Sequence, residues 1–202
     1  MHLSTRIPAP DPARERRLLD EGWILLDEPR STAAALLSSA PSMLIAAAIT
    51  LGIAALFVPV SPGFFGLGGG ESFSVRIGLP ALFAVIGVAV LHELVHLACI
   101  PRTARASRTS LCTGWAGLFV VCEEELERNR HLLISIAPFL AISVGGTLAL
   151  GALGLLTPFL LAVLTLNAMG SSVDLLTASA VLRQVPKGAV IAAAGMRTYW
   201  KR

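Results

Sequence analysis

The amino-acid sequence predicts an all-α membrane protein, with four transmembrane helices, a small cytoplasmic β-hairpin and short polar termini. Of its 202 residues, 54% are hydrophobic and only 14% are charged, and the mean hydropathy is +0.73. A soluble domain of this length could not cover so much apolar surface. The polar start lacks the charged n-region and adjacent apolar stretch of a cleaved signal peptide. The first apolar helix is therefore expected to remain in the membrane.

Residues 1–39 are predicted to form a cytoplasmic N-terminal segment. Within it, residues 11–20 are expected to be helical, because Asp11 is a suitable N-cap and Pro12 suits the first helical position. Gly22 is expected to end this helix, and an extended stretch should follow.

Four apolar stretches are long enough to cross a bilayer, for which about 20 residues suffice. Prolines and a run of glycines separate the first stretch from the second, and a Thr-Pro turn separates the third from the fourth. Together they predict a transmembrane domain over residues 40–182, with spans at about 40–60, 78–100, 132–156 and 159–182.

The segment between the second and third spans turns polar and basic. Within it, residues 109–122 have a strand-like composition around Gly114 and are too short to span, so a β-hairpin is expected. This hairpin either pairs with an extended substrate strand or packs as a flap at the membrane surface. The acidic run 123–127 should begin a helix, because acids offset the positive end of the helix dipole.

Charge placement predicts the orientation. Fifteen of the sixteen Lys and Arg residues fall on one side of the four-span arrangement, and the loop 61–77 holds the other. Positive residues favour the cytoplasm, so both termini and the hairpin are expected there. The C-terminal tail, residues 183–202, is predicted to be short and cytoplasmic, with room for one strand. Its Tyr199 and Trp200 are candidates for an interfacial anchor.

Four titratable side chains fall inside the predicted spans: His92, Glu93, His96 and Asp174. A lone charged Asp at the centre of a span costs roughly 2.5–3.5 kcal/mol, so these residues need partners. The spacing H-E-x-x-H puts both imidazoles on one helix face, where they can bind zinc, with Glu93 placed to act on a metal-bound water. His92 and Asp174 each precede the cytoplasmic end of their span by eight residues, about 12 Å in depth.

Asn167 shares a helix face with Asp174 and is a candidate catalytic residue. Its amide either stabilises the oxyanion of a tetrahedral intermediate or forms an interhelical hydrogen bond. Cys99 lies three residues after His96 and either approaches the metal or acts as a small hydrophobe. His131 is expected at the interface, beside two arginines.

The segment HELVH (92–96), together with the later NAMGSSVD (167–174), resembles the site-2-protease-like intramembrane metalloproteases. The chain is most similar to a small prokaryotic branch named the putative zincin peptidases, which EGW (21–23), EP (28–29) and AP (137–138) also fit. The resemblance implies His92, His96 and Asp174 as zinc ligands, Glu93 as catalytic, and residence in a prokaryotic cell membrane. The chain departs from better-known members, which carry a proline where Gly170 stands and a glycine where Leu175 stands. It also lacks a PDZ-like insertion.

These features predict an intramembrane zinc metalloprotease that hydrolyses membrane-associated protein substrates near the cytoplasmic face. Glu93 would activate a zinc-bound water. The expected partners are the lipid bilayer and a membrane protein substrate, and no nucleic-acid motif is found. Two alternatives remain: a non-catalytic zinc-binding membrane adaptor, and a metal or proton transporter that uses His and Asp as a relay. Haem ligation is disfavoured, because His92 and His96 lie on one helix face.

Overall fold

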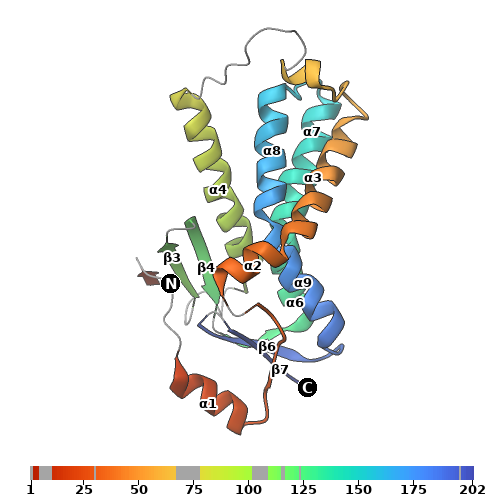
Figure 1. Cartoon of the computed structure of the whole chain (residues 1–202). Coiled ribbons are helices and arrows are strands. Elements are labelled where there is room, and N and C mark those ends of the chain that lie inside the picture. Colours follow the sequence, from red (N-terminus) through yellow and green to blue (C-terminus); the bar gives the residue numbers. More distant parts are fainter. Residues whose placement is uncertain are drawn as a thin grey trace.

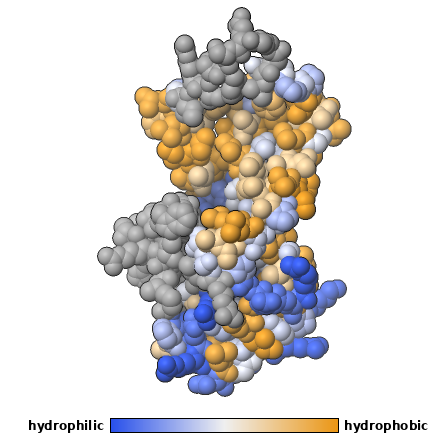
Figure 2. All heavy atoms as spheres, in the orientation of Figure 1, coloured by the Kyte–Doolittle hydropathy of each residue, from blue (hydrophilic) through white to orange (hydrophobic). Residues whose placement is uncertain are grey.

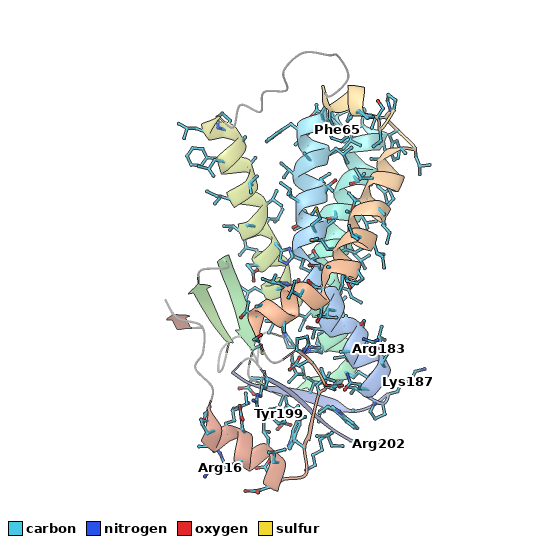
Figure 3. All side chains as sticks on the ribbon, viewed as in Figure 1. Arg16, Phe65, Arg183, Lys187, Tyr199 and Arg202 are labelled. Carbon is cyan, nitrogen blue, oxygen red and sulfur yellow. The ribbon has the colours of Figure 1, made fainter. Side chains whose placement is uncertain are left out.

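The computed structural model describes residues 2–4, 11–29, 31–66, 78–101, 109–114, 117–122, 124–195 and 197–202 (Figure 1). Long helices form one end of the molecule, and two small sheets with a short helix form the other. Apolar residues cover much of the helical part, whereas hydrophilic residues gather at the opposite end (Figure 2). Phe65 lies at the far end of the helices from Arg16, Arg183, Lys187 and Arg202 (Figure 3).

Two helices are long and apolar enough to cross a membrane by themselves. One is α4 (Leu79–Cys99). The other runs from Arg128 to Ala152 through α6 (Arg128–Pro138), the π-helical turn η2 (Phe139–Gly145) and α7 (Gly146–Ala152).

Two further pairs of helices would each make a span if a bent pair counts as one. The first pair, α2 (Thr32–Ser38) and α3 (Ala40–Ala54), bends by 48°. The second, α8 (Pro158–Gly170) and α9 (Ser172–Gln184), bends by 41°. A short 3₁₀ turn, η1 (Pro62–Phe65), follows α3. The described residues therefore provide two to four spans, in agreement with a protein embedded in a membrane.

The helix α4 stands away from α3, α7 and α8 at its first turns and contacts α6 and α8 further along (Figure 1). Only 6% of its apolar window is buried inside the protein, and large apolar side chains such as Leu79 and Phe83 are exposed. Such a surface would be unstable in water, whereas lipid chains would cover it. The other long helices pack on an apolar core that includes Ala54, Ile142 and Leu161.

The predicted hairpin at residues 109–122 is present. Strands β3 (Thr109–Gly114) and β4 (Gly117–Cys122) pair antiparallel, with Gly114 opposite Gly117. A short strand, β1 (His2–Ser4), adds to β3 in parallel. The chain is thus mostly helical with small sheets, not purely helical.

The two termini are not separate polar tails, because they build a second sheet together. Its strand order is β2 (Ile24–Leu25), β7 (Arg197–Lys201), β6 (Val190–Ala194) and β5 (Leu126–Glu127). The helix α1 (Pro12–Asp20) packs beside this sheet through Leu18, and Tyr199 is only 1% exposed in the same core cluster. Tyr199 therefore packs internally and is not an interfacial anchor.

Two predictions about where helices begin, one for α1 and one for α6, had different outcomes. Asp11 caps α1 as expected, since its carboxylate accepts hydrogen bonds from the backbone N–H groups of Ala13 and Arg14. The outcome for the acidic run at 123–127 is mixed, and residue 123 lies outside the described residues. Glu127 is the N-cap of α6, which begins at Arg128, but its side chain makes no capping hydrogen bond. Leu126 and Glu127 also pair with β6, so the end of the run joins the sheet as well as the helix start.

Candidate metal centre

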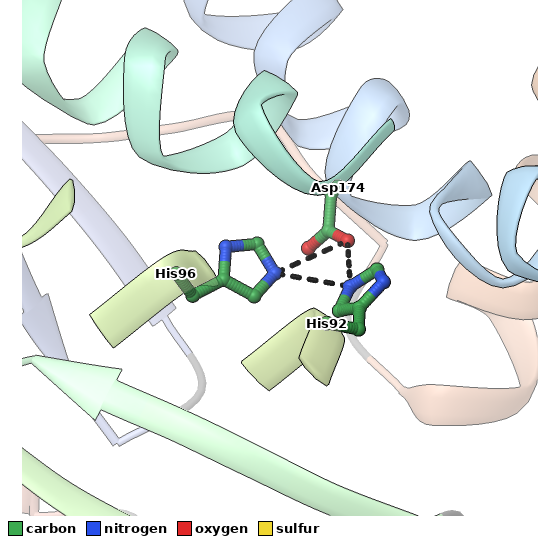
Figure 4. Close-up of side chains that lie close together, drawn as sticks. All are labelled: His92, His96 and Asp174. Atoms are coloured by element: carbon green, nitrogen blue, oxygen red, sulfur yellow. Dashed lines mark hydrogen bonds and ion pairs between the residues drawn. The ribbon is translucent and has the colours of Figure 1, made fainter. Parts of the chain in front are cut away.

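Three of the four titratable residues predicted inside the spans meet at one point. His92 and His96 lie on the last turns of α4, and Asp174 lies in the first turn of α9 (Figure 4). Among the described residues, these three form the group whose ligand atoms all lie within 4.8 Å of one another. Cys99 lies outside this group. The convergence expected from equal depths in two distant spans is therefore confirmed.

The spacing of the three ligand atoms fits a tetrahedral metal. Nε2 of His92 lies 3.2 Å from Nε2 of His96 and 3.3 Å from Oδ2 of Asp174. Nε2 of His96 lies 3.5 Å from the same carboxylate oxygen. Tetrahedral zinc with bonds of about 2.0–2.1 Å places its ligand atoms about 3.3–3.4 Å apart. The side chains need little movement to hold such an ion.

The bend between α8 and α9 brings Asp174 to this position. At the bend, Ser171 turns its hydroxyl back to the carbonyl of Asn167, four residues earlier. Hydroxyls that bond in this way often bend helices, and Gly170 beside it weakens the helix further. Asp174 consequently sits in the first turn of a new helix, where the positive end of the dipole favours a carboxylate.

Each histidine is held through its second ring nitrogen. Nδ1 of His96 lies 2.9 Å from the carbonyl oxygen of Ile134 in α6. Because a carbonyl only accepts, this nitrogen carries the hydrogen, and in the neutral imidazole Nε2 then keeps its lone pair. Second partners of this kind orient the imidazoles in metal sites.

A longer chain of hydrogen bonds holds His92. Ser143 in the π-helical turn donates its hydroxyl to the carbonyl of Leu164, so its oxygen accepts from Nδ2 of Asn167. The amide oxygen of Asn167 then faces Nδ1 of His92 at 3.1 Å. That direction of donation leaves the hydrogen on Nδ1 and the lone pair on Nε2 of His92.

Both imidazoles and the Asp174 carboxylate thus direct lone pairs at one another, with no hydrogen assigned to the space between them. Three such atoms at 3.2–3.5 Å repel one another unless a proton or a cation lies between them. Two neutral imidazoles and a carboxylate are the ligand types that zinc prefers, and three protein ligands are typical of its catalytic sites. The residues present therefore fit a zinc ion.

The centre is enclosed but can be reached. The side chains of His92 and His96 are 12% and 10% exposed, whereas that of Asp174 is 29% exposed. Asp174 is thus the most exposed of the three side chains, on the side where a catalytic zinc site needs its fourth, open position. Glu93 follows His92 on α4, is half-buried, and lies close enough for its charge to act on His96.

The structure places Asn167 in the interhelical hydrogen-bond network that was one of its two predicted roles. Its amide oxygen faces His92 and its amide nitrogen bonds Ser143. His131 differs from expectation: it is half-buried, and its Nε2 is buried without a hydrogen-bond partner among the described residues. It therefore does not extend into the interface with its neighbouring arginines.

Two members of this network were not predicted from the sequence. Ser143 is one of several serines in apolar stretches and has no distinguishing pattern around it. The carbonyl of Ile134 is a backbone group, which side-chain motifs do not mark. The one available signal is Pro138, which follows Ile134 by four residues.

A family model described as "Putative zincin peptidase" matches residues 85–190, just over half of the chain. The chain belongs to this family. The matched segment contains the three candidate ligands, Glu93 and Asn167. Comparison with curated proteins and with solved structures found no match. Membership of a zincin family and the geometry of the three ligands both indicate zinc.

Proposed function

We propose that this member of the zincin peptidase family is an intramembrane zinc metalloprotease. It would hydrolyse peptide bonds of membrane-associated protein substrates near the cytoplasmic face. The observation that supports this most directly is the convergence of His92, His96 and Asp174 on helices that are apolar enough to span a membrane.

His92, His96 and Asp174 would hold the ion, and Glu93 would handle protons. When bound, zinc supplies Lewis acidity that lowers the pKa of water toward about 7 and polarises a peptide carbonyl. Glu93 would take the proton from the attacking water and pass it to the leaving nitrogen. Asn167 and Ser143 would keep His92 in the tautomer that presents Nε2.

The site's setting agrees with a substrate embedded in the membrane. The exposed apolar surface of α4 leads along the same helix to His92 and His96. The excess of Lys and Arg on one side supports cytoplasmic termini, and the site would then lie near the cytoplasmic face. Strand β4 lies at the edge of its sheet and contacts α4. An extended substrate strand could add to this edge.

Metal analysis of the detergent-purified protein tests the site. Wild type should carry stoichiometric zinc, whereas His96→Ala and Asp174→Ala should lose it, because each removes one of three ligands. Glu93→Gln should keep its zinc, since Glu93 is not in the ligand group. Zinc that persists in both ligand variants would overturn the proposal.

The Glu93→Gln variant also separates the proposed protease from the two alternatives. Membrane proteomes of a deletion strain would be compared after complementation with wild type or with this variant. A protease predicts fragments that appear only with wild type. An adaptor would work equally well with either version. A transporter would carry zinc or protons into proteoliposomes, which the protease proposal excludes.

A further inference from the structure

The backbone carbonyl of Ile134, which faces Nδ1 of His96, lacks its usual helical hydrogen-bond donor because of a proline. In an α-helix the carbonyl of residue 134 would accept the N–H of residue 138. That residue is Pro138, which has no N–H to donate. The next N–H, that of Phe139, bonds Ile136 instead. The oxygen of Ile134 is consequently left to Nδ1 of His96, 2.9 Å away.

We infer that Pro138 is a positioning residue for the metal centre. By withholding a hydrogen-bond donor from Ile134, it lets that carbonyl accept the Nδ1 hydrogen of His96. The imidazole is then fixed in the tautomer whose Nε2 lone pair points at His92 and Asp174. Pro138 itself would not bind the ion, because a proline side chain offers no ligand atom.

The position of this proline differs from that of the others. In the described helices, Pro12, Pro41, Pro80 and Pro158 all lie in first turns, where the missing N–H has no helical partner in any case. Pro138 lies eleven residues into the helix that begins at Arg128, where proline removes a hydrogen bond and is unfavourable. The carbonyl that it releases is the one that contacts the metal centre.

The interruption of the helix at Pro138 also helps to position His92. The π-helical turn begins at Phe139, directly after Pro138. This turn contains Ser143, whose hydroxyl orients Asn167 and through it His92. Irregular turns of this type occur often at functional sites. One break in the helix between Arg128 and Ala152 thus supports both imidazoles.

The inference rests on the proposed zinc site, and a pair of variants tests it separately. Pro138→Ala restores an N–H that competes with His96 for the Ile134 carbonyl. Lactic acid incorporated at position 138 has the same methyl side chain but an ester oxygen in place of the N–H. Alanine should weaken zinc binding about 10–100-fold, whereas lactic acid should bind nearly as wild type does. Pro80→Ala, in the first turn of α4, is the matched control and should bind zinc normally.

A spectroscopic measurement on the metal-free protein provides the second readout. With ¹⁵N-labelled histidine, wild type and the lactic acid variant should show His96 protonated at Nδ1. Pro138→Ala should show a mixture of tautomers. A proline that only shaped the helix would weaken zinc binding equally in the alanine and lactic acid variants, and that result would overturn the inference. Unchanged zinc affinity in Pro138→Ala would also overturn it.

Failure of the proposed zinc site and failure of the role of Pro138 would give different results. If wild type binds no zinc, the proposed function fails, while the tautomer measurement still decides the role of Pro138. If Pro138→Ala does not fold, lactic acid at position 135 converts the Ile134 carbonyl to a weaker ester acceptor, and it should also weaken zinc binding. Ser135→Ala is its matched control, and equal zinc affinity in the two would contradict the inference.

Discussion

Replacing Asn167 with alanine tests whether this residue positions His92 through a hydrogen bond or contacts the substrate. In the structure its amide oxygen faces Nδ1 of His92 at 3.1 Å, and its amide nitrogen bonds Ser143 at 2.9 Å. Alanine removes the group that holds the hydrogen on Nδ1, so His92 can adopt the other tautomer or rotate. Either change withdraws the Nε2 lone pair from the metal position.

The expected magnitude follows from that contact. Loss of a second partner of a metal-ligating histidine typically weakens metal binding about 10–100-fold, which corresponds to about 1.4–2.8 kcal/mol. Ser143→Ala should have a smaller effect on zinc, because Asn167 keeps the oxygen that faces His92. That variant should instead cost about 1–3 kcal/mol of folding stability, since a buried amide nitrogen loses its partner.

The assay is competition for zinc between the detergent-purified protein and a chromophoric chelator. Thr165→Ala on the same helix is the control, because its hydroxyl bonds the carbonyl of Leu161, which is not part of the network around His92. The order of zinc affinity should be wild type equal to Thr165→Ala, then Ser143→Ala, then Asn167→Ala. Wild-type zinc affinity in Asn167→Ala, combined with lost cleavage, would refute a positioning role. It would make Asn167 a group that contacts the substrate.

Three further predictions concern stability. His131→Phe should raise the melting temperature, because it removes a buried nitrogen that has no hydrogen-bond partner among the described residues, a burial that destabilises the fold by about 1–3 kcal/mol. Zinc loss in this variant would instead give His131 a part in the site. Gly151→Ala should lower the melting temperature by the equivalent of about 1–3 kcal/mol, since a Cβ there would overlap the ring of Phe57. Gly52→Ala, in a helix with open space around it, should be neutral or stabilising, and equal destabilisation by both changes would contradict this packing. Burial raises the pKa of the Glu28 carboxyl, partly offset by hydrogen bonds from Thr198 and by the charge of Arg197. The folded protein therefore keeps this proton to higher pH than the unfolded chain, so stability should fall as pH rises from about 4.3 through the raised pKa. Glu28→Gln should reduce the dependence of the melting temperature on pH in this range. An unchanged dependence would show that another group causes it.

Much of the candidate site could be predicted because its signals are local. The i, i+4 spacing of His92 and His96 fixes their common helix face. The meeting with Asp174 was expected from a straight fourth span, whereas the structure reaches it through the 41° bend between α8 and α9. The orientation of Asn167 could not be predicted in this way. It depends on which of its neighbours donates, and this is decided by Ser143 and Leu164 on other parts of the fold.

The sequence by itself determined which stretches are apolar enough to form long helices, where Asp11 caps the first helix, and which residues can ligate a metal. These properties depend on side chains within a few positions of one another. Only the tertiary structure decided that Ile24 pairs with Trp200, and that the acidic run at Glu127 joins a sheet. It likewise decided that the carbonyl of Ile134 holds His96. The physical reason is that backbone groups are chemically alike in every residue, so their partners are chosen only when distant segments pack together.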